Sequence, residues 1–399
     1  MALDPYGAEY TTSLNAVGLN PELDPFPIES PATVDYWADN KGLLEKLLSA
    51  QADTLMFSTT KLYIFWGPLG VGKTFAVQYL SNKEVRRKIL QRLSKAGSQS
   101  DYLTTMVTAI APRRTGDLTF TVYKATVERL LDSIFEDESL IRLLREKGPG
   151  AESAAVGRAF ANMTKSVYKS LAGGDVNKQR LRETEGYRFL LLERNKLGKL
   201  QDTRDMIVAL KTLVSCLLTK FQRIVISIDE LENLRTSTIT EKFLFSDFVR
   251  KVHDEVDNGL TLVLIFSFPS FENVEDILQP AAASRTGAEP IEFPLVTKKD
   301  DVVEYISDCI RFRGKKDPDG VIEKEAIAKI AEDLLVASGK QLTFRDINKE
   351  MHRVFAMAFI ASGKQKKFTI NAALYGKSRK EPSVIKDLMK DLREASGGQ

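Results

Sequence analysis

The stretch that decides the fold is Lys61–Thr74, which reads KLYIFWGPLGVGKT. The run KLYIFW is rich in aromatic and branched residues, which is typical of a short buried strand. The next eight residues, Gly67–Thr74, match the pattern G-x-x-x-x-G-K-[ST] in full, and a helical pattern begins at Lys73. Glycines in such a loop let main-chain N–H groups turn towards phosphate oxygens without obstruction by side chains. The succession of strand, loop and helix therefore predicts a phosphate-binding loop.

The residue types in this loop suit the parts of a bound ATP molecule. The helix that follows points the positive end of its dipole at the phosphates. Lys73 would neutralise the β- and γ-phosphates, and the Thr74 hydroxyl would coordinate Mg²⁺. The expected nucleotide-binding positions are Gly67, Pro68, Gly70, Val71, Gly72, Lys73 and Thr74. The alternative is a Gly-rich turn without a ligand.

A second motif is the acidic pair that ends the apolar run Ile224–Ile228. Asp229, at the carboxyl end of this expected strand, is placed to hold Mg²⁺ directly or through water. Glu230 is then positioned to polarise an attacking water. Adjacent carboxylates repel each other without a cation, which is a further reason to expect a metal with the nucleotide. Such pairs are also common surface features, and the loop upstream favours the catalytic interpretation.

Strand and helix patterns alternate through the first three quarters of the chain. Short apolar runs mark five strands, at Lys61–Trp66, Thr104–Ala111, Ile224–Ile228, Leu262–Phe268 and Ile291–Phe293. Helical patterns separate them, which predicts an α/β fold with a mostly parallel sheet and helices on both faces. After Lys298 only helical periodicity remains, so we expect a small all-helical unit there.

These patterns divide the chain into domains. Residues 1–33, rich in Pro, Asn and Asp, are expected to form an extended arm. Residues 34–297 are expected to form the α/β core, with a helical insertion at about 113–202. Residues 298–375 would form a helical lid, and residues 376–399 a basic tail.

Composition narrows the class of protein. The 399 residues are 43% apolar and 28% charged, which is ordinary for a globular protein of two or three units. The N-terminus lacks a secretory signal, and no apolar run approaches the roughly 18 residues that span a bilayer. Cys216 and Cys309 lie far apart, and His253 and His352 are the only histidines. We therefore expect a cytoplasmic protein whose metal is Mg²⁺ held by oxygen ligands.

The order of these parts resembles the AAA+ ATPases. Within them it is similar to the branch of origin-recognition and initiator ATPases, with related archaeal and transposon-regulator ATPases. The resemblance covers roughly residues 30–360. It identifies the two motifs as Walker A and Walker B. It implies a Mg-dependent, ATP-hydrolysing P-loop NTPase whose AAA+ core is followed by the helical lid.

Two further segments are similar to nucleotide-sensing segments of that family. Leu262–Phe268 stands where the family has sensor 1, and Ser267, or Ser270 just beyond, would contact the γ-phosphate or the water. Thr343–Ile347 (TFRDI) is similar to sensor 2, with Arg345 as the residue that reaches the γ-phosphate. The plainer alternatives are a strand-end serine bonded to the backbone and a helix-start arginine paired with a nearby acid.

Ser284-Arg285-Thr286, followed by IEFPL, resembles the family segment whose arginine enters a neighbour's ATP site. The resemblance implies that Arg285 acts in trans and that the chain assembles into a ring or filament with ATP. The alternative is a surface arginine in a loop. The expected catalytic set is Glu230, Lys73, Arg285 and Ser267.

Charge distribution bears on the partner. The net charge is only +3, but basic residues gather at Lys83–Lys88 with Arg92 and Lys95, and again in residues 361–399. Such faces contact DNA phosphates or are simply solvated. Our leading interpretation is a DNA-associated loader or regulator that assembles on duplex DNA and has an unidentified protein partner. The alternative is a signalling, defence or remodelling ATPase that acts on protein alone.

Overall fold

The computed structural model describes residues 7–29, 34–38, 41–56, 59–93, 102–109, 118–171, 181–193, 203–256, 259–278, 290–339 and 341–379. The chain divides into two compact units. The sheet unit comprises Glu45–Pro68 and Arg86–Phe293. The helical unit comprises Met1–Leu44, Leu69–Val85 and Pro294–Gln399.

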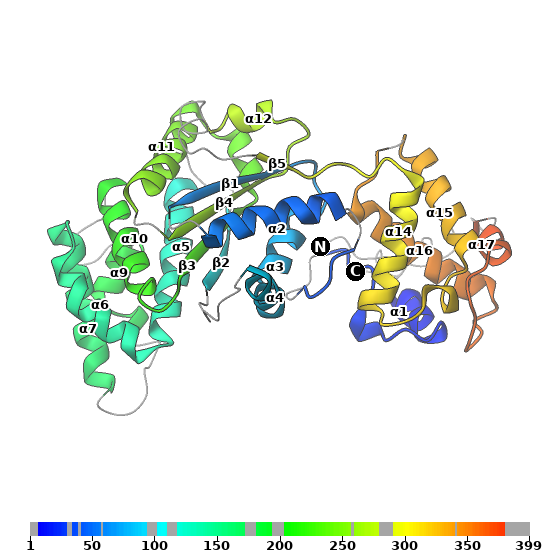
Figure 1. Ribbon diagram of the computed structural model, residues 1–399, viewed down its shortest axis with the longest axis horizontal. Helices are drawn as coiled ribbons and strands as arrows, with labels where there is room; N and C mark the ends of the chain where they lie inside the picture. Colours follow the sequence, from blue (N-terminus) through cyan, green and yellow to red (C-terminus); the bar gives the residue numbers. More distant parts are fainter. Residues whose placement is uncertain are drawn as a thin grey trace, which may run out of the picture. The chain divides into compact units, whose positions relative to one another are not determined.

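A five-stranded parallel sheet runs through the described part of the sheet unit (Figure 1). Its strands are β1 (Lys61–Trp66), β2 (Tyr102–Thr108), β3 (Arg223–Asp229), β4 (Leu260–Phe266) and β5 (Pro290–Glu292). Their order across the sheet is β2-β3-β4-β1-β5. Every residue of the central strand β4 is buried, as expected for a strand covered on both faces. The predicted α/β fold with a parallel sheet is therefore confirmed.

Most strand ends differ by one to three residues from the sequence prediction, and two of these differences bear on the site. β3 extends to Asp229, so the first carboxylate of the acidic pair is the last residue of the strand. β4 ends at Phe266, so Ser267 follows the strand instead of lying within it. The register pairs Trp66 with Phe266, and the ladder stops there because the chain of β1 turns away at Gly67, which has φ +146°.

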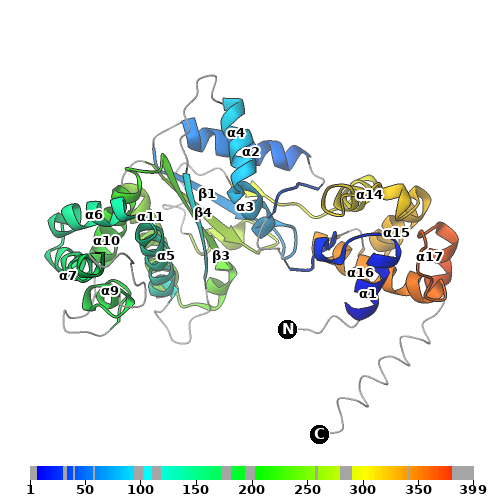
Figure 2. The ribbon, with the colours of Figure 1, turned by 90° about the horizontal axis from the view of Figure 1, so that it is seen from below.

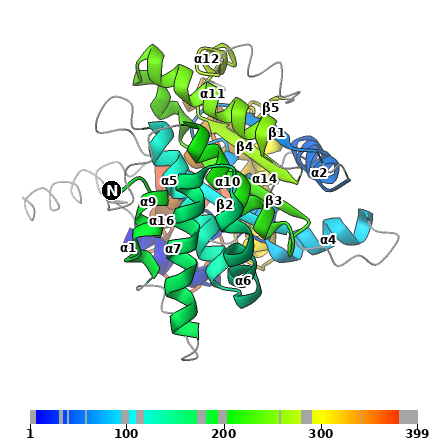
Figure 3. The same ribbon diagram turned by 90° about the vertical axis from the view of Figure 1, so that its left-hand side faces the viewer.

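Helices lie on both faces of the sheet, as Figures 2 and 3 show for α2 and α5. The helices of this unit, with α2 and α4 shared by both units, are α2 (Lys41–Met56), α4 (Lys83–Leu93), α5 (Leu118–Phe135), α6 (Glu138–Lys147), η2 (Gly148–Gly150), α7 (Ala154–Leu171), α9 (Glu185–Leu190), α10 (Thr203–Leu217), η3 (Leu231–Thr236), α11 (Ile239–Glu255) and α12 (Glu272–Glu275). The apolar stripe of α5, including Val122, Val127 and Leu131, is fully buried. Each such side chain contributes roughly 1.5–3 kcal/mol to stability.

The region predicted as a helical insertion contains α5, α6, η2, α7 and α9. Its helices pack closely because glycines stand at the contacts. A Cβ atom on Gly186 would lie 2.0 Å from the carbonyl oxygen of Ala159, and one on Gly148 would lie 2.6 Å from Cβ of Phe160. Asp137 caps α6 by accepting from the N–H of Ser139. Hydrogen bonds from Lys220 and Ser139 lower the pKa of Asp137 to about 2.

The helical unit holds the lid helices that the periodicity after Lys298 predicted. Its elements are α1 (Gly7–Ala16), η1 (Pro21–Leu23), α3 (Lys73–Ser81), α14 (Lys299–Asp308), the π-helical turn η4 (Cys309–Arg313), η5 (Pro318–Gly320), α15 (Lys324–Ala337), α16 (Phe344–Ala361) and α17 (Ala372–Arg379). None of the helices in either unit's described residues is long and apolar enough to cross a bilayer.

The N-terminal residues differ from the extended arm expected over residues 1–33. Residues 7–16 form helix α1, whose buried residues Tyr10 and Leu14 face α16. The Tyr10 ring stacks on His352 with 3.7 Å between ring centroids, and its hydroxyl donates to Asp24. Helix α1 forms because α16, which is distant in sequence, covers its apolar side. The Pro-rich composition of the neighbouring residues 21–32 instead led to the prediction of an extended arm.

We expect Gly186→Ala to lower the free energy of unfolding by about 1–3 kcal/mol, because the new methyl group overlaps the backbone of α7. Urea denaturation of the full chain measures this change. Gly150→Ala is the matched control, since nothing lies within 4 Å of the added Cβ atom there. Equal unfolding midpoints for the two variants would contradict the close packing of α7 and α9.

Candidate functional site

The phosphate-binding loop begins where β1 meets β5. The N–H of Phe293 donates to the carbonyl oxygen of Trp66 at 2.8 Å, which extends the pairing of β1 and β5 by one residue. A Cβ atom on Gly67 would lie only 2.3 Å from the carbonyl oxygen of Phe293. Glycine is therefore required at Gly67 for two reasons, its positive φ and the close backbone of Phe293.

The second part of the loop belongs to the helical unit and contacts α16. Gly70 has φ +87°, and its carbonyl oxygen accepts from the N–H of Arg345 at 3.2 Å. A Cβ atom on Gly70 would lie 2.9 Å from Cβ of Arg345 and 3.0 Å from Oγ1 of Thr343. The structure thus brings the sensor 2 candidate against the loop, although the two are distant in sequence.

The loop ends at the N-terminus of α3. Gly72, with φ +94°, is the N-cap residue, and no side chain caps the helix. Helix α3 begins at Lys73, which is 4% exposed, while Val71 is buried and Thr74 is half-buried. The first N–H groups of an α-helix lack partners within the helix, so a glycine-lined N-terminus fits a phosphate group.

Arg345 stands in the first turn of α16, and a capping box fixes the start of that helix. The Thr343 hydroxyl accepts from the N–H of Asp346 at 3.2 Å, and the Asp346 carboxylate accepts from the N–H of Thr343 at 3.3 Å. The Nε atom of Arg345 is buried without a hydrogen-bond partner, and Arg345 makes no ion pair within the described residues. The alternative of an arginine paired with a nearby acid therefore has no support in that part of the chain.

In the sheet unit, the acidic pair stands at the carboxyl end of β3. Asp229 is 8% exposed, and its Oδ1 atom accepts from the N–H of Glu230 at 2.8 Å. Glu230 is exposed and adopts a left-handed backbone conformation with φ 61° and ψ 32°. A non-glycine residue in that conformation costs of order 1 kcal/mol, and such residues often mark functional positions.

The short helix η3 holds the end of β3 in place. The N–H of Ala109, next to β2, donates to the carbonyl oxygen of Asp229 at 2.8 Å. The Asn233 side chain donates to the carbonyl oxygen of Ala109 at 2.8 Å. These bonds link Asp229 and Asn233, which lie on either side of Glu230 in the chain, to Ala109.

The surroundings of Glu230 raise its pKa above the usual value of a glutamate. Glu230 is exposed overall, but partial desolvation of its carboxyl group raises the pKa most, and the negative charges of Asp229 and Glu232 raise it further. A bound cation would oppose the effect of these charges.

The two serines proposed for sensor 1 have different surroundings. Ser267 is the first residue after β4, and its N–H donates to Oε2 of Glu232 at 3.3 Å. The Ser270 hydroxyl accepts from the N–H of Glu272, at the start of α12. Ser267 directly follows the end of β4, whereas Ser270 lies further along the chain and its hydroxyl accepts from the first residue of α12, so this placement favours Ser267.

Gly67, Asp229 and Ser267 share one edge of the sheet, because the carboxyl ends of parallel strands meet there and β4 separates β1 from β3. Gly67 and Pro68 belong to the sheet unit, whereas Leu69–Thr74 belongs to the helical unit with Arg345. Arg285 lies outside the described residues.

Sequence reasoning missed Glu232 and Asn233, which hold Ser267 and Ala109. Both follow the acidic pair in the run DELEN, and this concentration of polar side chains after a buried strand was a usable signal. In the basic stretch on α4, Lys83, Arg87 and Lys88 are exposed but Arg86 is buried, so Arg86 does not belong to the predicted charged face.

The chain matches no protein-family profile and no curated protein. Its fold is similar to that of the Aeropyrum pernix ORC2 protein in its ADP form, with a TM-score of 0.50 and 12% identity, over 89% of this chain and 71% of that one. The Aeropyrum pernix ORC1 protein in complex with DNA gives 0.49 and 14%, over 90% and 69%. Drosophila ORC bound to DNA gives 0.46 and 12%, over 89% and 64%. The structural neighbours are ORC-type AAA+ ATPases, and at these identities the likeness shows the fold.

We expect Gly70→Ala to weaken ATP binding at least about tenfold, because the methyl group would press on Arg345 and α16 and strain the positive φ. Titration with a fluorescent ATP analogue measures the dissociation constant. Gly42→Ala is the control, since no atom lies within 4 Å of its added Cβ. Unchanged affinity in Gly70→Ala would mean that the loop does not bind phosphate in this conformation.

Proposed function

We propose that this protein is an ATP-binding, ATP-hydrolysing AAA+ switch. The observation that carries the proposal is the loop between β1 and α3, in which three glycines have positive φ and an uncapped helix N-terminus follows. Asp229, the first residue of the acidic pair, ends β3 of the same parallel sheet, and Glu230 follows it. The ORC2 protein that shares the fold is described in an ADP form, which agrees with a nucleotide site.

In this proposal, ATP is the substrate, and its γ-phosphoryl group passes to water with ADP as the leaving group. Lys73 and the main-chain N–H groups of the loop would bind the phosphate oxygens, and Thr74 and Asp229 would hold a Mg²⁺ ion that stabilises charge on the phosphates. Glu230 orients the attacking water and takes up its proton. The raised pKa of Glu230 brings this carboxylate closer to the operating pH of a general base.

Three further residues respond to the γ-phosphate. Ser267 acts from the end of β4, where Glu232 fixes its backbone. Arg345 acts from α16, where its Nε atom is buried without a partner. Arg285 completes the site of a neighbouring subunit, so the chain assembles into a ring or filament when ATP is bound.

We further propose that the switch acts on duplex DNA, as a loader or regulator in the cytoplasm with a protein partner. Charge supports the DNA partner, because basic residues gather in short stretches of a chain whose net charge is only +3. Cys216 and Cys309 are free thiols within the described residues, in keeping with a reducing compartment.

One observation favours the alternative, a switch that acts on protein alone. Ile239 and Phe243, one turn apart at the start of α11, are 84% and 51% exposed. Apolar side chains grouped on a surface are typical of protein contacts. Ile239 and Phe243 follow η3 closely in the sequence. A protein bound to them would therefore contact residues only a short stretch of chain after Asp229 and Glu230.

Glu230→Gln tests the proposed reaction. We expect kcat for ATP hydrolysis to fall by about 10²–10⁴, because the amide cannot accept the proton of water, while ATP binding is retained. Phosphate release and ATP titration measure the two quantities. Glu275→Gln, an exposed glutamate on α12, is the control and should keep wild-type values. Hydrolysis that persists in Glu230→Gln would show that another group is the base.

The pH profile tests the environment of Glu230. A base must be ionised, and its raised pKa means that it gains a proton at a higher pH than an ordinary glutamate. We therefore expect kcat/KM to fall as the pH is lowered through this raised pKa, and Glu232→Gln to move the fall to lower pH by removing one negative charge. Glutamine keeps an oxygen that accepts from Ser267. An identical profile in wild type and Glu232→Gln would contradict this account.

A further inference from the structure

Residues 362–379 of the helical unit form a strongly basic segment. They read SGKQKKFTINAALYGKSR, with five basic residues and no acidic one. The net charge of the whole chain is +3, so this short segment carries more positive charge than the chain as a whole. It begins where α16 ends and includes α17.

The start of this basic segment has a fixed conformation. Gly363 and Lys364 both have positive φ, at 74° and 56°. The N–H of Lys364 donates to the carbonyl oxygen of Phe359 at 3.0 Å, and that of Gly363 to Ile360 at 2.9 Å. These bonds satisfy carbonyl groups in the last turn of α16, and the chain changes direction there. Lys364 has a left-handed backbone conformation that glycine usually adopts, so this conformation costs free energy.

The segment is also anchored after its lysines. The ring of Phe368 stacks on Phe359 with 6.2 Å between centroids, and its N–H donates to the carbonyl oxygen of Ala16. Ile370 is fully buried and pairs with Ile322 in a parallel bridge. The residues between these anchors, 364–367, are thus presented on a turn that is held at both ends.

The lysines on this turn are available to a ligand. Lys364, Lys366 and Lys367 are exposed, and within the described chain their side chains make no hydrogen bond or ion pair. Lys377 differs, because its Nζ atom donates to the carbonyl oxygen of Ala361 and so caps the end of α16. Arg379 pairs with Asp333 on α15. The segment therefore combines three cations that face solvent with two cations that fix its structure.

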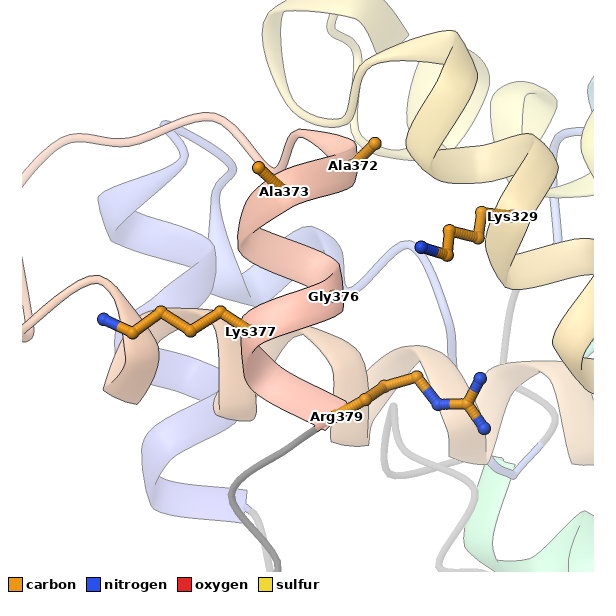
Figure 4. Close-up of a pocket in the computed structure, with 6 residues that line it drawn as sticks. All are labelled: Lys329, Ala372, Ala373, Gly376, Lys377 and Arg379. Atoms are coloured by element: carbon orange, nitrogen blue, oxygen red, sulfur yellow. The ribbon is translucent and has the colours of Figure 1, made fainter.

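A hollow of about 740 Å³ adjoins α17, which forms the last part of the basic segment (Figure 4). Lys329 of α15 and Arg379 lie on one side of α17, and the side chain of Lys377, which also lines the hollow, extends to the other side. Small residues form the wall: a Cβ atom on Gly376 would lie 3.8 Å from the Nζ atom of Lys329. The hollow therefore places the charged groups of Lys329 and Arg379 next to a stretch of α17 that has small side chains.

We propose that this basic segment, with Lys329, binds the phosphate backbone of duplex DNA. The proposal rests on the DNA partner in the proposed function and assigns the surface that this partner would contact. Lysines with no acidic residue between them match a regular row of phosphates, which supplies most of the affinity in non-specific DNA binding. In this proposal the basic segment of the helical unit binds DNA, and the nucleotide site does not contact the DNA.

The apolar residues of the segment decide between ligands. Phe368 is packed and Tyr375 is 1% exposed, so neither ring is free to stack on a base. No large apolar side chain of the segment is among the exposed ones in the described residues, as insertion into a membrane surface would need. The expected binding is therefore to the backbone of a duplex, dependent on salt and indifferent to sequence.

The test uses the full chain and a labelled duplex of random sequence. We expect the triple variant Lys364→Ala, Lys366→Ala, Lys367→Ala to bind at least about tenfold more weakly near 0.1 M salt. The slope of log K against log salt should fall by about 0.9 for each phosphate that the variant no longer neutralises. The matched control replaces Lys147, Arg158 and Lys165, three exposed basic residues of the helical insertion, with Ala and should bind as wild type.

Two further measurements make the outcome decisive. ATP hydrolysis should be the same in wild type and the triple variant, because none of the three lysines belongs to the nucleotide site; absent hydrolysis in both would count against the proposed function alone. Wild-type DNA affinity in the triple variant would overturn the assignment of this surface. If the triple variant loses binding to single-stranded RNA and retains binding to duplex DNA, the choice of ligand is wrong.

Discussion

The close approach of Gly67 to the carbonyl oxygen of Phe293 is the interaction on which the arrangement of the sheet unit depends. It ends β1 at Trp66, because the chain must turn away with φ +146°. The ladder to β4 ends at the same level, which leaves Ser267 just beyond the sheet. One backbone contact therefore decides where the loop begins and which serine stands at the sheet edge.

The acidic pair is held by a second set of backbone contacts that side chains complete. Asp229 accepts from the N–H of Glu230, and Asn233 bonds to the chain beyond β2. Glu232 accepts from Ser267, so the ends of β3 and β4 are joined through a carboxylate. That carboxylate also adds negative charge near Glu230. Glu232 thus holds the backbone of Ser267 and also raises the pKa of Glu230.

Local signals made much of the fold predictable from sequence. The strand Lys61–Trp66 and the helices Leu118–Phe135 and Phe344–Ala361 have the expected bounds, because a dense apolar pattern, a turn or a capping box marks their ends. Helix α1 was missed because its apolar side is covered by α16, a partner that is distant in sequence. The contact of Gly70 with Arg345 likewise depends on the folded chain, although the motifs around both residues were recognisable.

Helix α16 has a consequence for how the helical unit moves. Its first turn is bonded through Arg345 to the phosphate-binding loop, and its last residues lead into the turn that carries Lys364. Eighteen residues of α-helix span about 27 Å and bend little over that length. The helix therefore joins the loop at Gly70 to the turn that carries Lys364 through one stiff element. A tilt imposed at one end displaces the other end as part of the same rigid body.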